Sequence, residues 1–242
     1  MPRRNKLLAR CAAVAILAAA ASRAHADDTT APHYKLTLGR YHDAQTGGAT
    51  DLNLRRSFST GNAWLGYYNA SDVGERQWRL GADGSVDLSA VRLQPAAQVA
   101  SHGYAAASLG VEAGDRWFVG VGVGRTNLRP NVNLNFDPND SWSLTAGWRE
   151  GGVSYQLQYI ADNRQNPDQR HLHLVWRQPM PDGQRLTVDL LHKQGLLDGS
   201  TIRRWGTTLG YDWPVFFVRV ALDPNVNFTP VTQWRVSGGT RF

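Results

Sequence analysis

The side chains of this chain best suited to chemistry are arginines that recur at alternate positions of short segments. Most of their immediate neighbours are apolar or aromatic, which would place the arginines together on one face of a β-sheet. Their planar guanidinium groups suit carboxylates, phosphates or sulfates. Fewer carboxylates share this parity, namely Asp51, Asp83, Asp189 and Asp212. The arginines are Arg55, Arg79, Arg92, Arg149, Arg177, Arg204, Arg219, Arg235 and Arg241.

Two interpretations of these arginines stay open. Their surplus over the acids could create a positive surface that attracts anions. Alternatively, each could pair with a carboxylate on an adjacent strand and stiffen the sheet. Asp189 beside Arg177 or Arg204, and Asp212 near Arg204 or Arg219, would be such pairs.

Recognised catalytic motifs are absent from the sequence. It contains no GxSxG, HExxH, CxxC, Walker or dinucleotide-binding pattern, and no helix follows the glycines of 120–124. We therefore predict no enzymatic activity and no cofactor. A lipid hydrolase is the weaker alternative, with His192 and Ser200 as the nearest Ser–His pair. His171 and His173 could both reach a metal from the lumen, but we expect no ligand carboxylates near them and therefore predict no metal site.

Short segments with alternating apolar and polar residues make up the chain after residue 26. Clusters of Gly, Asn, Asp and Pro separate them, which is typical of an all-β protein. Thirteen breaks imply fourteen strands, with 12 or 16 as alternatives. Short breaks, such as 82–84, largely alternate with long ones, such as 193–201. The alternating residues 132–136 are assigned to the longest loop, because a further strand would make the number odd.

The amino terminus has the features of a secretory signal peptide over residues 1–26. Basic residues precede a short apolar run, and Ala24-His25-Ala26 is a typical cleavage site. This segment holds five of the 26 basic residues and none of the 20 acidic ones, so the rest carries 21 basic and 20 acidic residues. The near-neutral remainder, residues 27–242, gives no support for a nucleic-acid partner and is expected to form one domain.

Aromatic residues distinguish a membrane barrel from a secreted β-sandwich. Most tryptophans are predicted near strand ends, as in the interfacial girdles of membrane barrels: Trp64, Trp78, Trp117, Trp142, Trp148, Trp176, Trp205, Trp213 and Trp234. The final segment, 234–242, alternates and ends in Phe242. Together with the signal peptide, these features resemble Gram-negative outer-membrane β-barrel proteins of the monomeric-porin kind, although no motif indicates a closer family. The resemblance implies that Phe242 is part of the assembly signal.

The resemblance implies a single antiparallel up-and-down β-barrel spanning the outer membrane. Its partners would be outer-membrane lipid and lipopolysaccharide, and barrel-assembly machinery would insert it. The arginines would line the lumen, because a charge facing lipid costs about 2–4 kcal/mol near the midplane. We expect a channel for passive diffusion of small hydrophilic solutes, preferentially anions. The alternative is a non-conducting structural or assembly barrel associated with envelope or exopolysaccharide export.

Two further features bear on what fills such a lumen. Gly120, Gly122 and Gly124 next to Ala106, Ser108 and Gly110 would leave one wall with little side-chain bulk. Water or an inserted loop must then occupy the space. The candidate is segment 125–140, in which the possible constriction residues are Asn131, Asn133, Asn135, Asp137, Asn139 and Asp140. The same segment could instead stand outside as an ordinary loop.

Overall fold

A computed structural model describes residues 33–44, 47–134, 137–166 and 168–242 of the protein. The predicted signal peptide lies outside these residues. The strands are β1 (Tyr34–Asp43), β2 (Gly47–Phe58), β3 (Gly61–Ala70), β4 (Glu75–Gly84), β5 (Val86–Leu88), β6 (Val91–Ala100), β7 (Tyr104–Gly114), β8 (Trp117–Thr126), β9 (Ser141–Glu150), β10 (Val153–Asp162), β11 (Arg170–Pro179), β12 (Arg185–Leu197), β13 (Ser200–Asp212), β14 (Phe216–Asp223) and β15 (Gln233–Arg241). Single 3₁₀ turns occupy η1 (Ser71–Val73), η2 (Ser101–Gly103), η3 (Pro181–Gly183) and η4 (Val226–Phe228). No helix among the described residues is long and apolar enough to cross a membrane.

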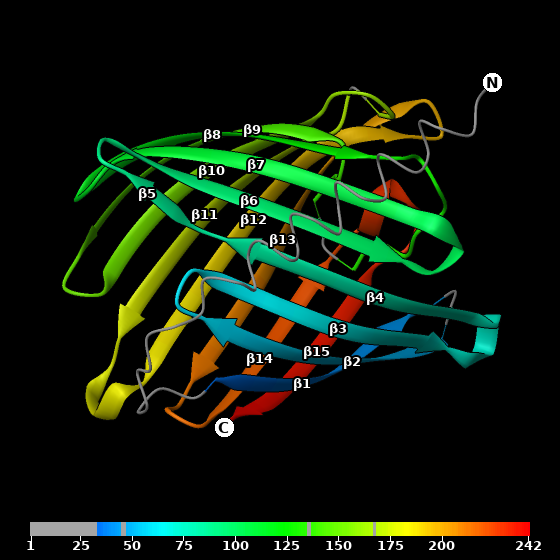
Figure 1. Cartoon of the computed structure of the whole chain (residues 1–242). Coiled ribbons are helices and arrows are strands. Elements are labelled where there is room, and N and C mark those ends of the chain that lie inside the picture. Colours follow the sequence, from blue (N-terminus) through cyan, green and yellow to red (C-terminus); the bar gives the residue numbers. More distant parts are fainter. Residues whose placement is uncertain (1–32, 45–46, 135–136, 167) are drawn as a thin grey trace, which may run out of the picture.

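All strands belong to one antiparallel sheet that closes on itself (Figure 1). Consecutive strands pair along the chain, and β1 pairs with β15 to complete the circle. Tyr34 and Phe242 exchange backbone hydrogen bonds of 2.8 and 3.0 Å at this seam. Closure leaves no unpaired sheet edge, which is a requirement for a sheet surrounded by hydrocarbon.

β4 and β5 together form one strand position, so the barrel has fourteen strands as predicted. Both pair with β6 in the same register, and only Ser85 separates them. The pairing with β6 is interrupted at Gly84 and Ser85, opposite Pro95 and Gln94, and Pro95 has no N–H to donate to the ladder. On its other side the strand stays paired, because the Ser85 N–H donates to the Thr60 carbonyl at 2.8 Å.

Two predicted breaks are wrong in position, although the strand number is right. The break expected at 82–84 is displaced to Ser89 and Ala90, because Leu88 still pairs with Val91. The long loop expected at 193–201 is a tight turn, since β12 and β13 continue to Leu197 and Ser200. Asp198 and Gly199 both have positive φ, 50° and 78°, as a two-residue type I′ hairpin requires.

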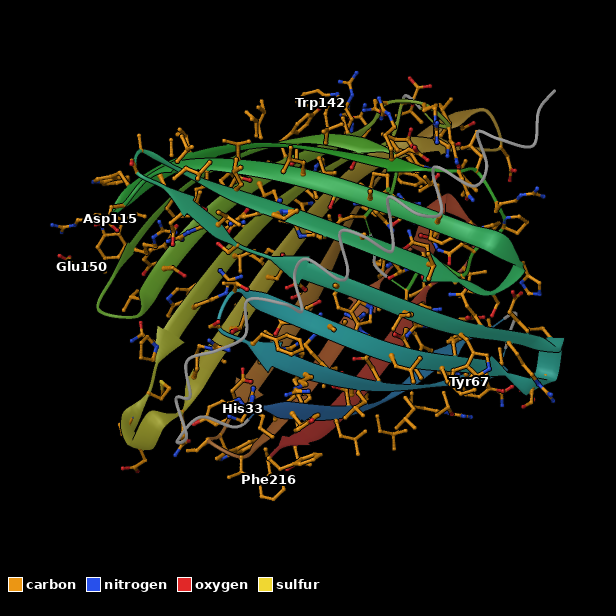
Figure 2. The ribbon with its side chains drawn as sticks, viewed as in Figure 1. His33, Tyr67, Asp115, Trp142, Glu150 and Phe216 are labelled. Carbon is orange, nitrogen blue, oxygen red and sulfur yellow. The ribbon has the colours of Figure 1, made fainter. Side chains whose placement is uncertain are left out.

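The outer face of the barrel is apolar and exposed. Between strand ends it carries Leu and Val side chains, among them Leu38, Val119 and Val121, which are 56–61% exposed. Aromatic residues mark both ends, with Trp142, Trp205 and Trp234 toward the longer loops and Trp117, Trp148 and Phe216 toward the short turns. Trp142 and Phe216 point away from the barrel, whereas Asp115 and Glu150 lie at its short-turn end (Figure 2). This is the surface of a barrel with hydrocarbon around its middle.

Trp64 is an exception to the predicted outer girdle. Its neighbours across the sheet are Arg55 on β2 and Gly81 on β4, both on the inner face. A Cβ at Gly81 would lie 2.3 Å from the Trp64 ring, so the glycine makes room for the indole. The guanidinium of Arg55 lies 4.9 Å from the ring centre. Trp64 therefore packs inside the barrel and does not face lipid.

Candidate functional site: the barrel lumen

All nine predicted arginines lie on the inner face. The register fixes this face around the whole barrel, because each strand's alternate residues align with those of the next. Five of the arginines pair with inner carboxylates: Arg79–Asp51 at 2.5 Å, Arg92–Asp87 at 2.7 Å, Arg149–Glu112 at 2.8 Å, Arg55–Asp83 at 3.4 Å, and Arg241 with Asp212. Cross-strand pairing therefore accounts for part of the arginine set.

The predicted partners of two aspartates are wrong. Asp212 pairs with Arg185, which lies directly opposite it on β12, and with Arg241, which reaches it from β15 across β14. Asp189 contacts His173, with Asp189 Oδ1 2.9 Å from the ring Nδ1. Each carboxylate thus contacts groups other than the arginines expected for it.

Several cations of the inner face have no carboxylate partner. Within the described part of the chain, no carboxylate oxygen lies within 4.0 Å of Lys35, Arg177, Arg204 or Arg219. Arg204 lies at the mouth of the barrel, where its Nε donates to Asn225 Oδ1 at 2.8 Å. Lys35 was not among the predicted lumen-facing cations, although it lies on the same inner face as Thr37 and Gly39, two and four residues further along β1.

Like charges stand side by side on the wall formed by β2, β1 and β15. Lys35 lies directly opposite Arg55 on one side and Arg241 on the other. The buried ring of Phe217 lies beneath three cations, with Lys35, Arg241 and Arg219 at 4.2, 5.1 and 5.4 Å from its centre. Like charges in register destabilise a sheet, and the face of an aromatic ring offsets part of this cost.

The segment between β8 and β9, described over residues 127–134 and 137–140, folds into the lumen. The side-chain amide of Gln77 on β4 forms two hydrogen bonds with the backbone of Val132. Val132 and Leu134 pack against a buried inner-face cluster that includes Tyr41 and Tyr68. Arg235 Nη1 on β15 donates to the Leu134 carbonyl at 3.3 Å. This segment, the lumen loop, therefore reaches from one wall of the barrel to the opposite one.

The end of the lumen loop is fixed by Asp140, whose side chain is 2% exposed. Its carboxylate accepts hydrogen bonds from the Thr126 N–H and O–H, at 3.1 and 2.6 Å, and pairs with Arg164 at 2.6 Å. Burial opposes its ionisation, but these hydrogen bonds and the Arg164 charge outweigh burial and hold the pKa of Asp140 below its ordinary value.

Asp137 of the lumen loop contacts two imidazoles on β11. Its Oδ1 lies 2.9 Å from both His171 Nδ1 and His173 Nε2. The premise that these histidines have no carboxylate nearby is therefore wrong. Asp137 lies 34 residues from His171 in sequence, so only folding of the loop brings it there.

Cavities lie on three sides of the lumen loop. The largest, about 620 Å³ and here called the basic cavity, includes Lys35, Arg55, Arg79, Arg219 and Arg235 in its lining, with Asp51 as its one carboxylate among the described residues. A second cavity of about 420 Å³ lies against the predicted small-residue wall, including Ser108, Gly110, Gly120, Gly122 and Gly124. A third, of about 430 Å³, lies at the loop end and shares Asn131, Asn133 and Asn139 with the basic cavity.

The predicted site residues therefore fall into distinct groups. The basic cavity gathers Arg55, Arg79, Arg219 and Arg235, whereas Arg92, Arg149, Arg177 and Arg204 do not line it. Asn131 and Asn133 line it as well, and Asp137 and Asp140 tie the loop to the wall. Asn135 lies outside the described residues. Asn139, also among the predicted residues of this segment, lines the basic cavity too.

The Ser–His pair considered for a lipid hydrolase is not assembled. His192 pairs in register with Trp205, and Ser200 pairs with Leu197. Five positions along the hairpin separate the two, which corresponds to about 16 Å at the rise of a strand. His192 instead packs its ring against Trp205, with the centres 4.8 Å apart.

Neither a protein-family model nor a curated protein matches this chain. Solved structures with a similar arrangement include three barrels. OprD from Pseudomonas aeruginosa has 9% sequence identity and a TM-score of 0.45, and the match covers 89% of this chain and 96% of OprD. The KdgM porin has 13% identity and a TM-score of 0.41, with 85% of this chain and 99% of the porin covered. The translocator domain of the autotransporter NalP from Neisseria meningitidis has 13% identity and a TM-score of 0.38, with 96% of this chain and 98% of that domain covered. At TM-scores below 0.5, none of these similarities bears on what this chain transports or binds.

Proposed function

We propose that this protein is an outer-membrane channel for passive diffusion of small hydrophilic solutes, with a preference for anions. The observation that carries the proposal is the basic cavity, whose described lining holds five cationic side chains and one carboxylate. Arg79 engages Asp51 at 2.5 Å and Arg55 pairs with Asp83 at 3.4 Å, whereas Lys35 and Arg219 have no carboxylate within 4.0 Å among the described residues. Rings of Arg and Lys are a common source of anion selectivity in pores.

Confinement strengthens the effect of these charges. The walls of the cavity are protein and the exterior is apolar, so the field of the cations is screened less than at an open surface. Lys35 and Arg219, which have no carboxylate within 4.0 Å among the described residues, contribute most directly. An anion entering the cavity would also relieve the repulsion between Lys35 and its cationic neighbours Arg55 and Arg241.

The lumen loop would set the size of solute that passes. Asn131, Asn133 and Asn139 line both the cavity at the loop end and the basic cavity, so they stand at the boundary between the two. Their amides donate and accept hydrogen bonds without adding charge. This placement supports a constriction that admits hydrated solutes and leaves charge selection to the cations beyond it.

The apolar outer face with aromatic belts supports placement in the outer membrane, against lipid and lipopolysaccharide. Assembly there would use barrel-assembly machinery and the signal peptide of residues 1–26. Phe242 is positioned to take part, because its ring lies 5.8 Å from that of Tyr34 at the seam and is 60% exposed. Outer-membrane placement, export by the signal peptide and the role of Phe242 in assembly are therefore proposed together with the channel.

One observation favours the alternative of a non-conducting structural or assembly barrel. The lumen loop is fixed to β4, β11 and β15, so it crosses the space that a solute would use. A barrel in which the loop remained in place permanently would be closed.

Conductance separates the two functions. The purified barrel is inserted into planar lipid bilayers with different KCl concentrations on the two sides, and the reversal potential is recorded. Stepwise conductance with a reversal potential toward that of chloride is expected. Bilayers with inserted protein but no steps would overturn the channel and favour the structural barrel, and a potential toward that of potassium would overturn the anion preference.

A further inference from the structure

Asp137, His171 and His173 bring three ligand atoms of a transition metal to one place. One oxygen or nitrogen from each residue lies within 4.8 Å of the others. The contacts of Asp137 Oδ1 with His171 Nδ1 and His173 Nε2 are both 2.9 Å. Ligand atoms around a tetrahedral zinc ion lie about 3.3 Å apart, given bonds of about 2.0–2.1 Å. The two contacts of Asp137 are a few tenths of an ångström shorter than this spacing, and no pair of the three ligand atoms is more than 4.8 Å apart, so adjustment of the side chains would admit the ion.

The surroundings of His173 match those of a metal-bound histidine. Its other nitrogen, Nδ1, lies 2.9 Å from Asp189 Oδ1. Metal-ligating histidines almost always donate their second N–H to a carboxylate, a carbonyl or water, which fixes the ring and leaves the first nitrogen free for the ion. Asp189 would serve here as the positioning residue.

His171 shows that the protein alone does not satisfy this cluster. Its side chain is 2% exposed, and its Nε2 is buried without a hydrogen-bond partner among the described residues. Its Nδ1 and His173 Nε2 share a single carboxylate oxygen. An ion bound by Nδ1 of His171 and Nε2 of His173 would give each ring its own bond in place of this shared contact, while Nε2 of His171, on the other side of its ring, would take water as its partner.

We propose that Asp137, His171 and His173 bind a divalent transition-metal ion, with Zn²⁺ as the reference ion. Two imidazoles and one carboxylate suit zinc and its neighbours, whereas calcium and magnesium prefer oxygen ligands alone. Water would complete the coordination, because the Asp137 side chain is 35% exposed and also lines the cavity on the small-residue wall. The ion can enter from this cavity or from the one at the loop end, which His171 lines.

Such an ion would cross-link the lumen loop to the barrel wall. Asp137 belongs to the loop, and both histidines belong to β11, so coordination joins the two by bonds in place of hydrogen bonds. Binding of the ion does not depend on conduction. The effect of the ion on the lumen loop does rest on the proposed channel function. We expect the bound ion to reduce the number of opening and closing events of the pore.

Isothermal titration of Zn²⁺ into the detergent-solubilised barrel, prepared without a histidine tag, tests the site. One Zn²⁺ per barrel is expected, with Ca²⁺ not bound. His171→Ala and Asp137→Asn should abolish the binding, and Asp189→Asn should weaken it about 10–100-fold. His192→Ala, on the outer face, should bind as the wild type does. Absence of Zn²⁺ binding, or equal binding by all variants, would overturn the site.

Two measurements keep the outcome decisive. A heat-dependent gel shift shows whether each variant is a folded barrel. If His171→Ala is not, Asp137→Asn decides the question, because Asp137 lies in the loop outside every strand. Titration in detergent also separates the two proposals, since a barrel that binds Zn²⁺ without conducting would retain the metal site and lose the channel.

Discussion

The side-chain amide of Gln77 bonds the backbone of Val132 through both of its groups. Gln77 Nε2 donates to the Val132 carbonyl at 3.1 Å, and the Val132 N–H donates to Gln77 Oε1 at 2.8 Å. Gln77 is 2% exposed and lies 55 residues from Val132 in sequence. A glutamine amide thus acts toward the loop as a strand neighbour would, and it holds the loop against β4, from which β6 and β7 separate β8.

Replacing Gln77 by Ala is expected to loosen the lumen loop. Two neutral hydrogen bonds contribute about 1–3 kcal/mol together, so the loop would leave its docked position more often. Single-channel recordings should then show a larger mean conductance and more frequent steps than the wild type.

Gln98→Ala is the matched control for this change. Gln98 also lines the basic cavity, from β6, but makes no hydrogen bond to the lumen loop among the described residues. Gln98→Ala removes the same side-chain atoms from the lumen as Gln77→Ala does, but it does not release the loop. Equal recordings for Gln77→Ala and the wild type would mean that this bridge does not control the loop.

Removing the cations without carboxylate partners should weaken anion selectivity. Lys35→Ala together with Arg219→Ala takes two charges from the basic cavity and leaves its Arg79–Asp51 pair intact. The reversal potential in a KCl gradient should move toward zero. Arg203→Ala, which removes a charge from an exposed residue on the outer face, should leave the potential unchanged. A double variant as selective as the wild type would place the origin of selectivity elsewhere.

The barrel and its two faces were predictable from the sequence because the constraint acts on every residue. Each residue of a strand faces either lipid or the lumen, so the period of two appears along the whole chain. Arg79, Arg219 and Arg235 could be placed on the inner face from this alone. The sequence marks the lumen loop as a candidate for filling the lumen but leaves open whether it docks there, because docking depends on partners such as Gln77 and Tyr41, far away in sequence.

Polar residues within strands caused the main error. The polar residues Lys193 and Gln194, followed by Gly195, predict a loop, although all three continue β12 to the Asp198-Gly199 turn. The charge of Lys193 is tolerated there because Asp223 on β14 lies beside it, a pairing that no local pattern indicates. The Asp-Gly dipeptide was the available signal for a hairpin turn.

The Lys193–Asp223 pair is the most buried ion pair among the described residues, with side chains 1% and 0% exposed. Lys193→Met should destabilise the barrel by about 3–5 kcal/mol, because it leaves the carboxylate buried without its counter-ion. Urea unfolding in detergent or lipid, followed by the heat-dependent gel shift, measures the change.

The double variant Lys193→Met with Asp223→Leu should recover most of the lost stability. Replacing both charges with apolar groups of similar size removes the uncompensated carboxylate and the cost of burying it. If the double variant were as unstable as the single one, packing around Asn225 and Phe228, which also contact Lys193, would be the cause.

Phe242 is expected to matter for assembly more than for the stability of the finished barrel. Its contact with Tyr34 has the ring centres 5.8 Å apart, and such a pair contributes about 0.5–1.5 kcal/mol beyond the area it buries. Phe242→Ala should therefore leave the unfolding midpoint of barrels refolded in vitro nearly unchanged. In cells, the amount of heat-modifiable barrel in the membrane fraction should fall well below that of the wild type.

Phe216→Ala is a closely matched control, because Phe216 is also an aromatic residue of the outer face at the short-turn end. The two residues are 61% and 60% exposed, so each change removes a similar contact with the surroundings. Phe216→Ala should reach the membrane in wild-type amounts, since it lies inside β14 and not at the carboxy terminus. If both variants assembled equally well, Phe242 would contribute only as one more residue of the aromatic belt.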